Sequence, residues 1–323
     1  MNRDLTVIEE VGQLQNYRSK EKLIEKFILS QDITEKSREA YRKSLKQFFA
    51  FLRDLNLELN SLLREHILSY KDFLKKRGLS ANTVSAYLVS VRKFFEWTEA
   101  IKLYPNIARG IKGAKKPKGF RKDSLTVRQV FSVLGSISKE TIQGKRDYAI
   151  LNLLVRTGLR TIEVAKANIE DIRQEGGEAI LYIQGKGRES KDEFVLLTEE
   201  TLLPIREYLT DREEVKESSP LFSSLSDRNK NGRLTTRSIR RIVKEHLKGA
   251  GIEDNRLTAH SFRHTAITLS LMAGASIQEA QVLGRHANVN TTLVYAHNID
   301  RLKNAPERRI EAFLKREKVA SVA

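Results

Sequence analysis

The chain has 323 residues, with 58 Lys and Arg against 41 Asp and Glu, so its formal net charge is +17, and 40% of its residues are hydrophobic. This composition predicts a folded protein of about two domains with a basic surface that attracts polyanions, above all nucleic acid. The sequence has no cysteine, which excludes disulfides, thiolate nucleophiles and Cys-based zinc sites. It has neither a secretory signal pattern nor an apolar run of about 18 residues, so we expect a soluble, unexported protein without a membrane partner.

The segment from Leu23 to Ile111 has apolar residues three and four positions apart, which predicts a small bundle of helices. Within it, AYRKSLKQFFAF and AYLVSVRKFFEW share an Ala-Tyr start and a Phe-Phe pair in the same register. We therefore expect two core helices that bury matched aromatic residues. Thr34 and either Ser80 or Thr83 are suitable N-caps, and the N–H groups of such helix starts can bind phosphates.

A basic linker follows at positions 112–123, where KGAKKPKGFRKD combines basic residues with two glycines and a proline. A basic hinge suits a protein that closes around duplex DNA, whereas a solvated connector without a ligand is the alternative. The residues predicted to contact DNA are Arg92 and Lys93 in the preceding helix, and Lys112, Lys115, Lys116, Lys118, Arg121 and Lys122 in the linker.

After the linker, the pattern from Leu125 to Arg173 is again helical. EAILYIQGKGRESKDEFVLL, at positions 178–197, then has two β-type runs around a Gly-Lys-Gly-Arg turn, which predicts a hairpin. Helical patterns resume near Thr201. The predicted fold is mainly α with a small antiparallel β-sheet. The predicted parts are an N-terminal extension at 1–21, a helical DNA-binding domain at 22–111, the linker at 112–123, a second domain at 124–315 and a tail at 316–323.

The residues suited to chemistry gather in the second domain. TAHSFRHT places His260 and Arg263 on one helix face, with His264 at the next position. An imidazole beside a guanidinium suits a scissile phosphate, because arginine donates two hydrogen bonds to its oxygens and histidine moves a proton near neutral pH. His260 and His264 also have the spacing of metal ligands, but Ser261 stands where a zinc protease has glutamate, so we predict no metal site.

Two further motifs carry candidate residues. In TGLRTIE, a helix begins anew after a glycine, with Arg160 near the turn and Glu163 one helical step away. In VLGRHANVNTTLVYAH, His286 follows a glycine break and lies nine positions before Tyr295. A phenol with its ordinary pKa near 10 is a poor nucleophile, so Tyr295 can attack a phosphate only if cationic groups make that phosphate electrophilic.

These motifs resemble, in order and spacing, those of the tyrosine recombinases, also called phage-type integrases, over about residues 124–314. TGLRTIE resembles the first arginine motif of that family, GKG its lysine motif, HSFRHT its His-x-x-Arg box and GRHANVNTTLVYAH its closing box. The helical N-terminal region is more loosely similar to the SAM-like core-binding domain. One departure is Arg285, where the family more often has glycine directly before the histidine, so the local loop geometry is expected to differ there. The catalytic set implied by the resemblance is Arg160, Lys186, His260, Arg263, His286 and Tyr295, supported by Glu163 and His264.

The resemblance also implies the roles of these residues. Arg160 and Arg263 would hold the phosphate oxygens, and His286 would hydrogen-bond the phosphate. Tyr295 would attack, with His260 accepting its proton, and Lys186 would protonate the departing 5′-oxygen. The product would be a 3′-phosphotyrosine intermediate, formed without a metal or other cofactor.

The partners implied by the resemblance are double-stranded DNA with inverted-repeat half-sites and further copies of the chain. We expect a monomer in solution, a homotetramer on two DNA sites, possible accessory DNA-binding proteins, and a cytoplasmic location at the nucleoid. The N-terminal extension is too short for the arm-binding domain of larger integrases, which favours a compact Xer-like or mobile-element enzyme. The alternatives are a type IB topoisomerase-like or telomere-resolving enzyme, and a catalytically idle DNA-binding regulator.

The C-terminal stretch NIDRLKNAPERRIEAFLKREKVASVA predicts a docking helix. Pro306 can begin it, and Ile310, Phe313 and Leu314 then fall on one face. This apolar stripe is too small to form a domain alone, so it must pack elsewhere. The sequence leaves open whether it packs on its own catalytic domain or, as the resemblance implies, on a neighbouring subunit.

Overall fold

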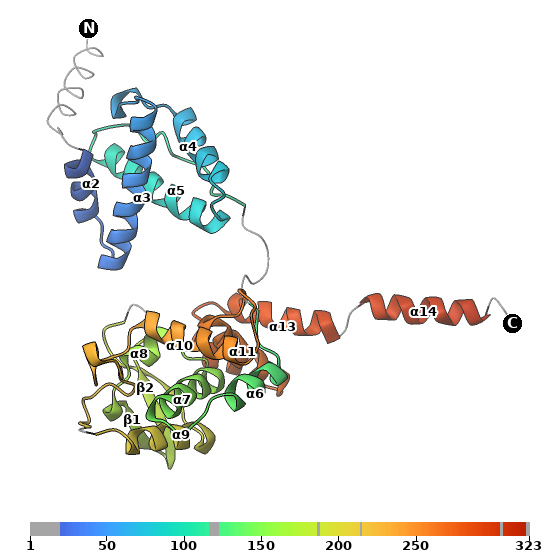
Figure 1. The fold of residues 1–323 in the computed structure, drawn as a ribbon. Helices are drawn as coiled ribbons and strands as arrows, with labels where there is room; N and C mark the ends of the chain where they lie inside the picture. Colours follow the sequence, from blue (N-terminus) through green and yellow to red (C-terminus); the bar gives the residue numbers. More distant parts are fainter. Residues whose placement is uncertain (1–19, 116–122, 186–187, 214, 304–305, 321–323) are drawn as a thin grey trace, which may run out of the picture. The chain divides into compact units, whose positions relative to one another are not determined.

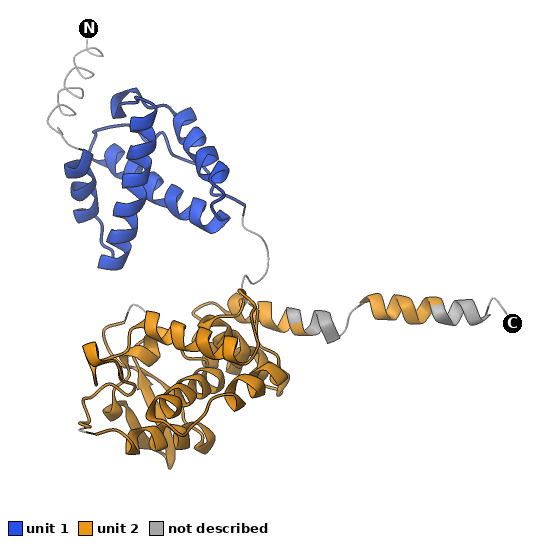
Figure 2. Ribbon diagram, in the orientation of Figure 1, with its two compact units in different colours: residues 1–118 blue, residues 119–323 orange. Residues whose placement is uncertain are grey.

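The computed structural model describes residues 20–115, 123–185, 188–213, 215–303 and 306–320. Its chain divides into two compact units, Met1–Lys118 and Gly119–Ala323 (Figure 2). Unit 2 contains the predicted small sheet, and both units are otherwise mainly helical (Figure 1). The predicted fold class is therefore confirmed. Among the described residues, no helix combines the length and the apolar character needed to cross a bilayer.

Unit 1 is a bundle whose core is rich in aromatic rings. Phe48 and Phe49 of α3 (Glu35–Asp54) and Phe94 and Phe95 of α5 (Ala81–Ala100) are all buried, and the two pairs meet in edge-to-face contacts. This arrangement confirms the matched aromatic helices predicted from the repeated sequence. Thr34 and Ser80 cap the two helices as predicted. The elements of the unit are α2 (Lys20–Leu29), α3 (Glu35–Asp54), η1 (Leu59–Ser61), α4 (Arg64–Lys76) and α5 (Ala81–Ala100).

Unit 2 begins with helices, continues through a three-stranded sheet and returns to helices. The N-terminal elements are α6 (Val127–Gly135), α7 (Ile142–Thr157), α8 (Thr161–Lys166) and η2 (Ile169–Asp171). The sheet consists of β1 (Ile172–Glu175), β2 (Glu178–Ile183) and β3 (Glu193–Leu196). The remaining elements are α9 (Glu199–Thr210), η3 (Asp227–Asn229), α10 (Thr236–Gly249), α11 (Ala259–Met272), α12 (Ile277–Gly284), α13 (Val289–Lys303) and α14 (Pro306–Ala320).

The sheet is antiparallel in the order β1-β2-β3, and Leu181 of the central strand lies opposite Ile172 and Val195. The helical prediction for Leu125 to Arg173 was wrong at its end, because β1 starts at Ile172. A turn through Gly176 and Gly177, with φ of 59° and 86°, joins β1 to β2. The first strand is an edge strand that is largely exposed, so it lacks the apolar alternation that identifies strands in a sequence.

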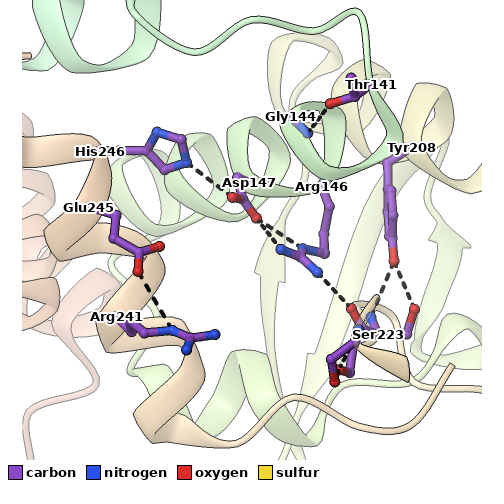
Figure 3. A network of polar contacts seen from close by, with 11 residues as sticks. Thr141, Gly144, Arg146, Asp147, Tyr208, Ser223, Arg241, Glu245 and His246 are labelled. Carbon is purple, nitrogen blue, oxygen red and sulfur yellow. Dashed lines mark hydrogen bonds and ion pairs between the residues drawn. The ribbon is translucent and has the colours of Figure 1, made fainter. Parts of the chain in front are cut away.

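A buried polar network fixes α10 against α7 (Figure 3). The carboxylate of Asp147 accepts hydrogen bonds from Nε and Nη2 of Arg146 at 2.9 and 2.7 Å, and lies 3.0 Å from Nε2 of His246 on α10. Arg146 also donates to the carbonyl oxygen of Ser223, whose side chain hydrogen-bonds the hydroxyl of Tyr208 on α9. Loss of one member of such a buried charge pair typically costs about 3–5 kcal/mol. The network therefore holds three helices in place just before the chain enters α11.

Candidate active site

Helix α11 brings His260, Arg263 and His264 into the site. Arg263 is only 2% exposed, and its Nη1 donates to the carbonyl oxygen of Gly158 at 2.7 Å. Its Nη2 is buried without a hydrogen-bond partner among the described residues, which is unusual for a charged group. His260 is exposed, and its ring centroid lies 4.5 Å from that of His264. The helix thus presents a fixed cation with spare donor capacity beside two imidazoles.

Arg160 lies at the start of α8, directly after the turn that ends α7. Gly158 makes this turn possible, because its φ of 62° lies in the left-handed region that favours glycine. Nη1 of Arg160 pairs with Oε1 of Glu163 at 2.7 Å, and the backbone N–H of Arg160 donates to Oε2 of the same carboxylate. The side chain of Glu163 is fully buried, and its carboxylate fixes the orientation of this guanidinium. The carbonyl oxygen of Gly158 accepts from Arg263, which joins the two arginine motifs.

His286 lies in the turn between α12 and α13. A β-carbon at Gly284 would lie 2.8 Å from Cε1 of His286, so the ring can approach this backbone only because residue 284 is glycine. Nδ1 of His286 lies 2.9 Å from the hydroxyl of Thr292, and its backbone oxygen accepts from Nε2 of Gln281. These contacts fix the orientation of the imidazole. Arg285 adopts φ of 45°, so the loop keeps a left-handed turn although the residue is not glycine.

Tyr295 lies on α13 and is 4% exposed. Its ring packs with Ile267 of α11 and Ala280 of α12, and its hydroxyl hydrogen-bonds Nδ1 of His264. The ring centroid of His286 lies 6.1 Å away. Contacts through His264 and Tyr295 join His260 and His286, and contacts through Glu163, Arg285 and Gly158 join Arg160 and Arg263. The structure therefore brings together five of the six residues implied by the resemblance. Lys186 lies outside the described residues.

Burial sets the electrostatics of the site. It lowers the pKa of both His264 and His286 to about 4, with neighbouring histidine and arginine charges adding to the effect, so both imidazoles are neutral at pH 7. Burial also raises the pKa of Tyr295 to about 12, although the charge of Arg263 acts in the opposite direction. Burial lowers the pKa of Arg263 to about 9, and the guanidinium remains charged at neutral pH. The resting site thus holds a protonated phenol beside neutral imidazoles and cationic arginines.

The residues predicted to contact DNA differ in their surroundings. Arg92 donates to the backbone oxygen of Ile111, and Lys93 pairs with Glu96 at 2.8 Å. Both therefore have partners within unit 1. Lys112 and Lys115 are exposed, as a role in binding a polyanion requires. The other linker residues, Lys116, Lys118, Arg121 and Lys122, lie outside the described residues.

Sequence reasoning missed a basic stripe on α10. His260 is exposed at the surface, but neighbouring groups partly desolvate its ring. This desolvation lowers the pKa of His260, and the charges of Arg263, Arg160 and Arg240 add to the effect, so Arg240 of α10 lies near the site. Its neighbours on the same face recur three or four positions apart, a spacing that was visible in the sequence. The opposite face carries buried aliphatic residues. The exposed stripe consists of Arg237, Arg240, Lys244 and Lys248.

Sequence reasoning also missed the role of Thr292. It is fully buried, hydrogen-bonds His286 and precedes Tyr295 by three positions on α13. This spacing places Thr292 and the tyrosine on one face of the helix. The spacing of this threonine and the tyrosine is visible in NTTLVY, but its meaning depends on the hydrogen bond to His286, which only the structure shows.

Comparison with known proteins agrees with this arrangement. Residues 124–301 match the model of the phage integrase family, and residues 21–102 match the N-terminal SAM-like domain of phage integrases. A tyrosine recombinase XerC of Leptospira interrogans is 30% identical over 79% of this chain and 81% of its own length. A XerD of Listeria monocytogenes is 28% identical over 85% of this chain and 93% of its own. The chain therefore belongs to the phage integrase family, the tyrosine recombinases.

Solved structures share the fold. XerH recombinase bound to a palindromic difH substrate, in a post-cleavage complex, matches 95% of this chain and 90% of its own with a TM-score of 0.72 at 21% identity. A lambda integrase dimer bound to a core site matches 84% of this chain and 96% of its own, with a TM-score of 0.65 at 17% identity. Because the relatives are recombinases, the topoisomerase-like, telomere-resolving and idle-regulator alternatives are not favoured.

Proposed function

We propose that this protein is a site-specific DNA recombinase that cuts and rejoins DNA through a 3′-phosphotyrosine intermediate. The observation that carries the proposal is the position of the Tyr295 hydroxyl, which is hydrogen-bonded to His264 in a site that also holds Arg160 and Arg263. A buried tyrosine beside neutral imidazoles and arginines has a proton acceptor and, nearby, donors suited to a phosphate. The names of the relatives support the same activity.

In the proposed reaction, the phenol oxygen of Tyr295 forms a bond to phosphorus and the bond to the 5′-oxygen breaks. Arg160 and Arg263 would stabilise the charge on the non-bridging oxygens, and Nη2 of Arg263, which is buried and has no hydrogen-bond partner among the described residues, would donate to one of these oxygens when the phosphate enters the site. The phenol proton passes to an imidazole. His264 is hydrogen-bonded to this hydroxyl through Nδ1 and would accept the proton in the tautomer that leaves Nδ1 unprotonated; His260, which the resemblance implied as the acceptor, lies next to it. Lys186 would protonate the leaving oxygen.

The DNA duplex is expected to lie across the exposed imidazole of His260 and the basic stripe of α10. Arg237, Arg240, Lys244 and Lys248 give this face a positive charge close to the site. Such residues attract phosphates and position the duplex without selecting a sequence. The exposed residues Lys112 and Lys115 would add to the same attraction.

The proposal is tested with a DNA duplex selected from a random-sequence pool by binding to the purified protein. A nicked form of this duplex should trap a covalent protein–DNA adduct that survives denaturing electrophoresis. Two selected duplexes of different length should yield recombinant products, whereas a topoisomerase would only relax supercoils. Binding without any adduct on nicked duplexes scanned through the selected site would contradict the proposal.

Cleavage is expected to proceed at an unchanged rate in excess EDTA. In the proposed mechanism, arginines supply the positive charge that metal ions supply in many other phosphoryl-transfer enzymes. The adduct is measured over time with EDTA and, in parallel, with Mg²⁺. A strict requirement for a divalent ion would contradict metal-independent cleavage.

We further propose that α14 docks on a neighbouring subunit and supports a tetramer on two DNA sites. Ile310, Phe313 and Leu314 are 58%, 61% and 57% exposed, so the predicted apolar stripe is uncovered in the single chain. Pro306 begins the helix as predicted, and the helix extends to Ala320, beyond the predicted boundary at residue 315. An exposed stripe of this kind favours a partner outside the subunit.

Truncation before Pro306 is expected to leave binding to one half-site nearly unchanged, but to reduce cooperative filling of a two-half site and strand exchange. Gel-shift titration on one-half and two-half duplexes measures both quantities. In the full-length protein, Phe313→Ser should weaken cooperativity, whereas Arg309→Ala, on the same helix but outside the stripe, should not. Unchanged cooperativity in the truncated protein would indicate that the stripe packs within its own subunit.

A further inference from the structure

Arg285 ends α12 in a conformation that favours glycine. Its φ of 45° and ψ of 50° are left-handed, and a side chain is less stable than glycine in this region because its β-carbon crowds the following carbonyl oxygen. Neither the turn nor the adjacent His286 requires an arginine here. The side chain must therefore make contacts that offset the unfavourable backbone conformation.

Those contacts join the turn before His286 to the first arginine motif. Arg285 is almost fully buried, with a side chain 7% exposed. Its Nη2 donates to the carbonyl oxygen of Gly158 at 2.9 Å and to Oε2 of Glu163 at 3.1 Å, and its Nη1 donates to the carbonyl oxygen of Leu283 at 3.0 Å. In return, its own carbonyl oxygen accepts from Nη2 of Arg160 at 3.3 Å. One guanidinium thus connects α8, the turn after α7 and the turn after α12.

The carboxylate of Glu163 is shared between two arginines. Its Oε1 binds Arg160 at 2.7 Å and its Oε2 binds Arg285 at 3.1 Å. If Arg285 were absent, Arg160 would be the nearest cation left to this buried negative charge, and a stronger pairing would reduce the positive charge available to a DNA phosphate. Burial lowers the pKa of Arg285 while Glu163 acts to raise it, in agreement with a cation held in place by this carboxylate.

We propose that Arg285 is a positioning residue for DNA cleavage, which acts through Glu163 to keep Arg160 available to the scissile phosphate and through its turn to hold His286. The inference rests on the proposed recombinase function. It assigns no contact between Arg285 and DNA. A simple helix cap predicts the opposite behaviour, because glycine would then replace this arginine without loss.

Arg285→Gly is the first variant, since glycine suits the backbone and removes every side-chain contact. We expect thermal unfolding to show a folded protein and the affinity for the selected duplex to change less than about threefold. The single-turnover cleavage rate at saturating protein should fall by about tenfold or more, because arginines that are out of place lose much of their effect on the transition state. Val282→Ala is the matched control, because Val282 is 74% exposed on the same helix, and it should cleave at the wild-type rate.

A second pair of variants keeps the proposal testable if Arg285→Gly fails to fold. Arg285→Lys and Arg285→Gln face the same backbone constraint, but only lysine keeps the charge next to Glu163. We expect the lysine variant to cleave faster than the glutamine variant. A double-mutant cycle with Glu163→Gln tests whether Arg285 acts through Glu163. Removal of Arg285 should lower the cleavage rate much less when a neutral amide already replaces this carboxylate.

The outcomes separate this inference from the proposed function. If the wild-type protein forms no adduct, the recombinase proposal itself fails. If the wild type cleaves and Arg285→Gly cleaves equally fast, Arg285 only caps the helix and the inference is overturned. Equal rates for the lysine and glutamine variants, or full additivity with Glu163→Gln, would likewise overturn the route through Glu163.

Discussion

Tyr295→Phe is expected to form no covalent adduct with the nicked duplex while binding it nearly as tightly as the wild-type protein. The change removes one hydroxyl and no charge, so the electrostatic attraction to DNA is preserved. The lost oxygen is the only atom of this side chain that can bond to phosphorus. The hydroxyl also hydrogen-bonds buried His264, so a loss of stability of about 1 kcal/mol is expected as well.

The measurement is denaturing electrophoresis of the trapped adduct, with affinity determined by gel shift on the intact duplex. Tyr148→Phe is the matched control, since it makes the same chemical change on α7 of the same unit, at a partly buried tyrosine that has no assigned role in cleavage. The control should form adduct at the wild-type rate. An adduct in Tyr295→Phe would show that another residue is the nucleophile and would remove Tyr295 from its assigned role.

The residues of the site could be predicted from the sequence where they lie close together in the chain. His260 and Arg263 lie within one helical turn, and the spacing from His286 to Tyr295 is set by a short turn and the first part of α13. The resemblance in sequence implied His260 as the acceptor of the tyrosine proton, whereas the structure joins the tyrosine hydroxyl to His264. His260 and His264 are one turn apart on the same face, so only the packing of α11 against α13 decides between them.

Longer-range contacts were beyond the reach of sequence patterns. The pairing of Arg285 with Glu163 joins residues 122 positions apart, and the sequence alone indicated only that Arg285 is unusual in its motif. The fold was predictable where a pattern reports burial, as with Phe48 and Phe95 in the core of unit 1. The prediction was wrong at β1, because an exposed edge strand does not show the apolar alternation that identifies strands in a sequence.

Arg263→Ala is expected to lower the single-turnover cleavage rate by about a hundredfold or more, as does the removal of a preorganised donor in other enzymes. The loss should lie in the cleavage rate and not in binding, because many other exposed basic residues remain to attract the DNA, whereas among the described residues only Arg263 combines a buried side chain with an unpartnered Nη2. Arg160→Ala should have an effect of the same order. Because the guanidinium of Arg160 already pairs with Glu163, the loss of cleavage rate in this variant should be somewhat smaller than in Arg263→Ala.

Arg263→Lys separates charge from geometry. Lysine keeps the positive charge, but it cannot donate to the carbonyl oxygen of Gly158 and to a phosphate in the planar arrangement of a guanidinium. We therefore expect Arg263→Lys to recover only a small part of the lost rate, while Arg241→Lys, an exposed change on α10, should leave the rate unchanged. Rates are measured with protein in excess over the nicked duplex, so that affinity does not enter. A wild-type rate in Arg263→Ala would exclude this arginine from the stabilisation of the transition state, and the unpartnered donor would then need another explanation.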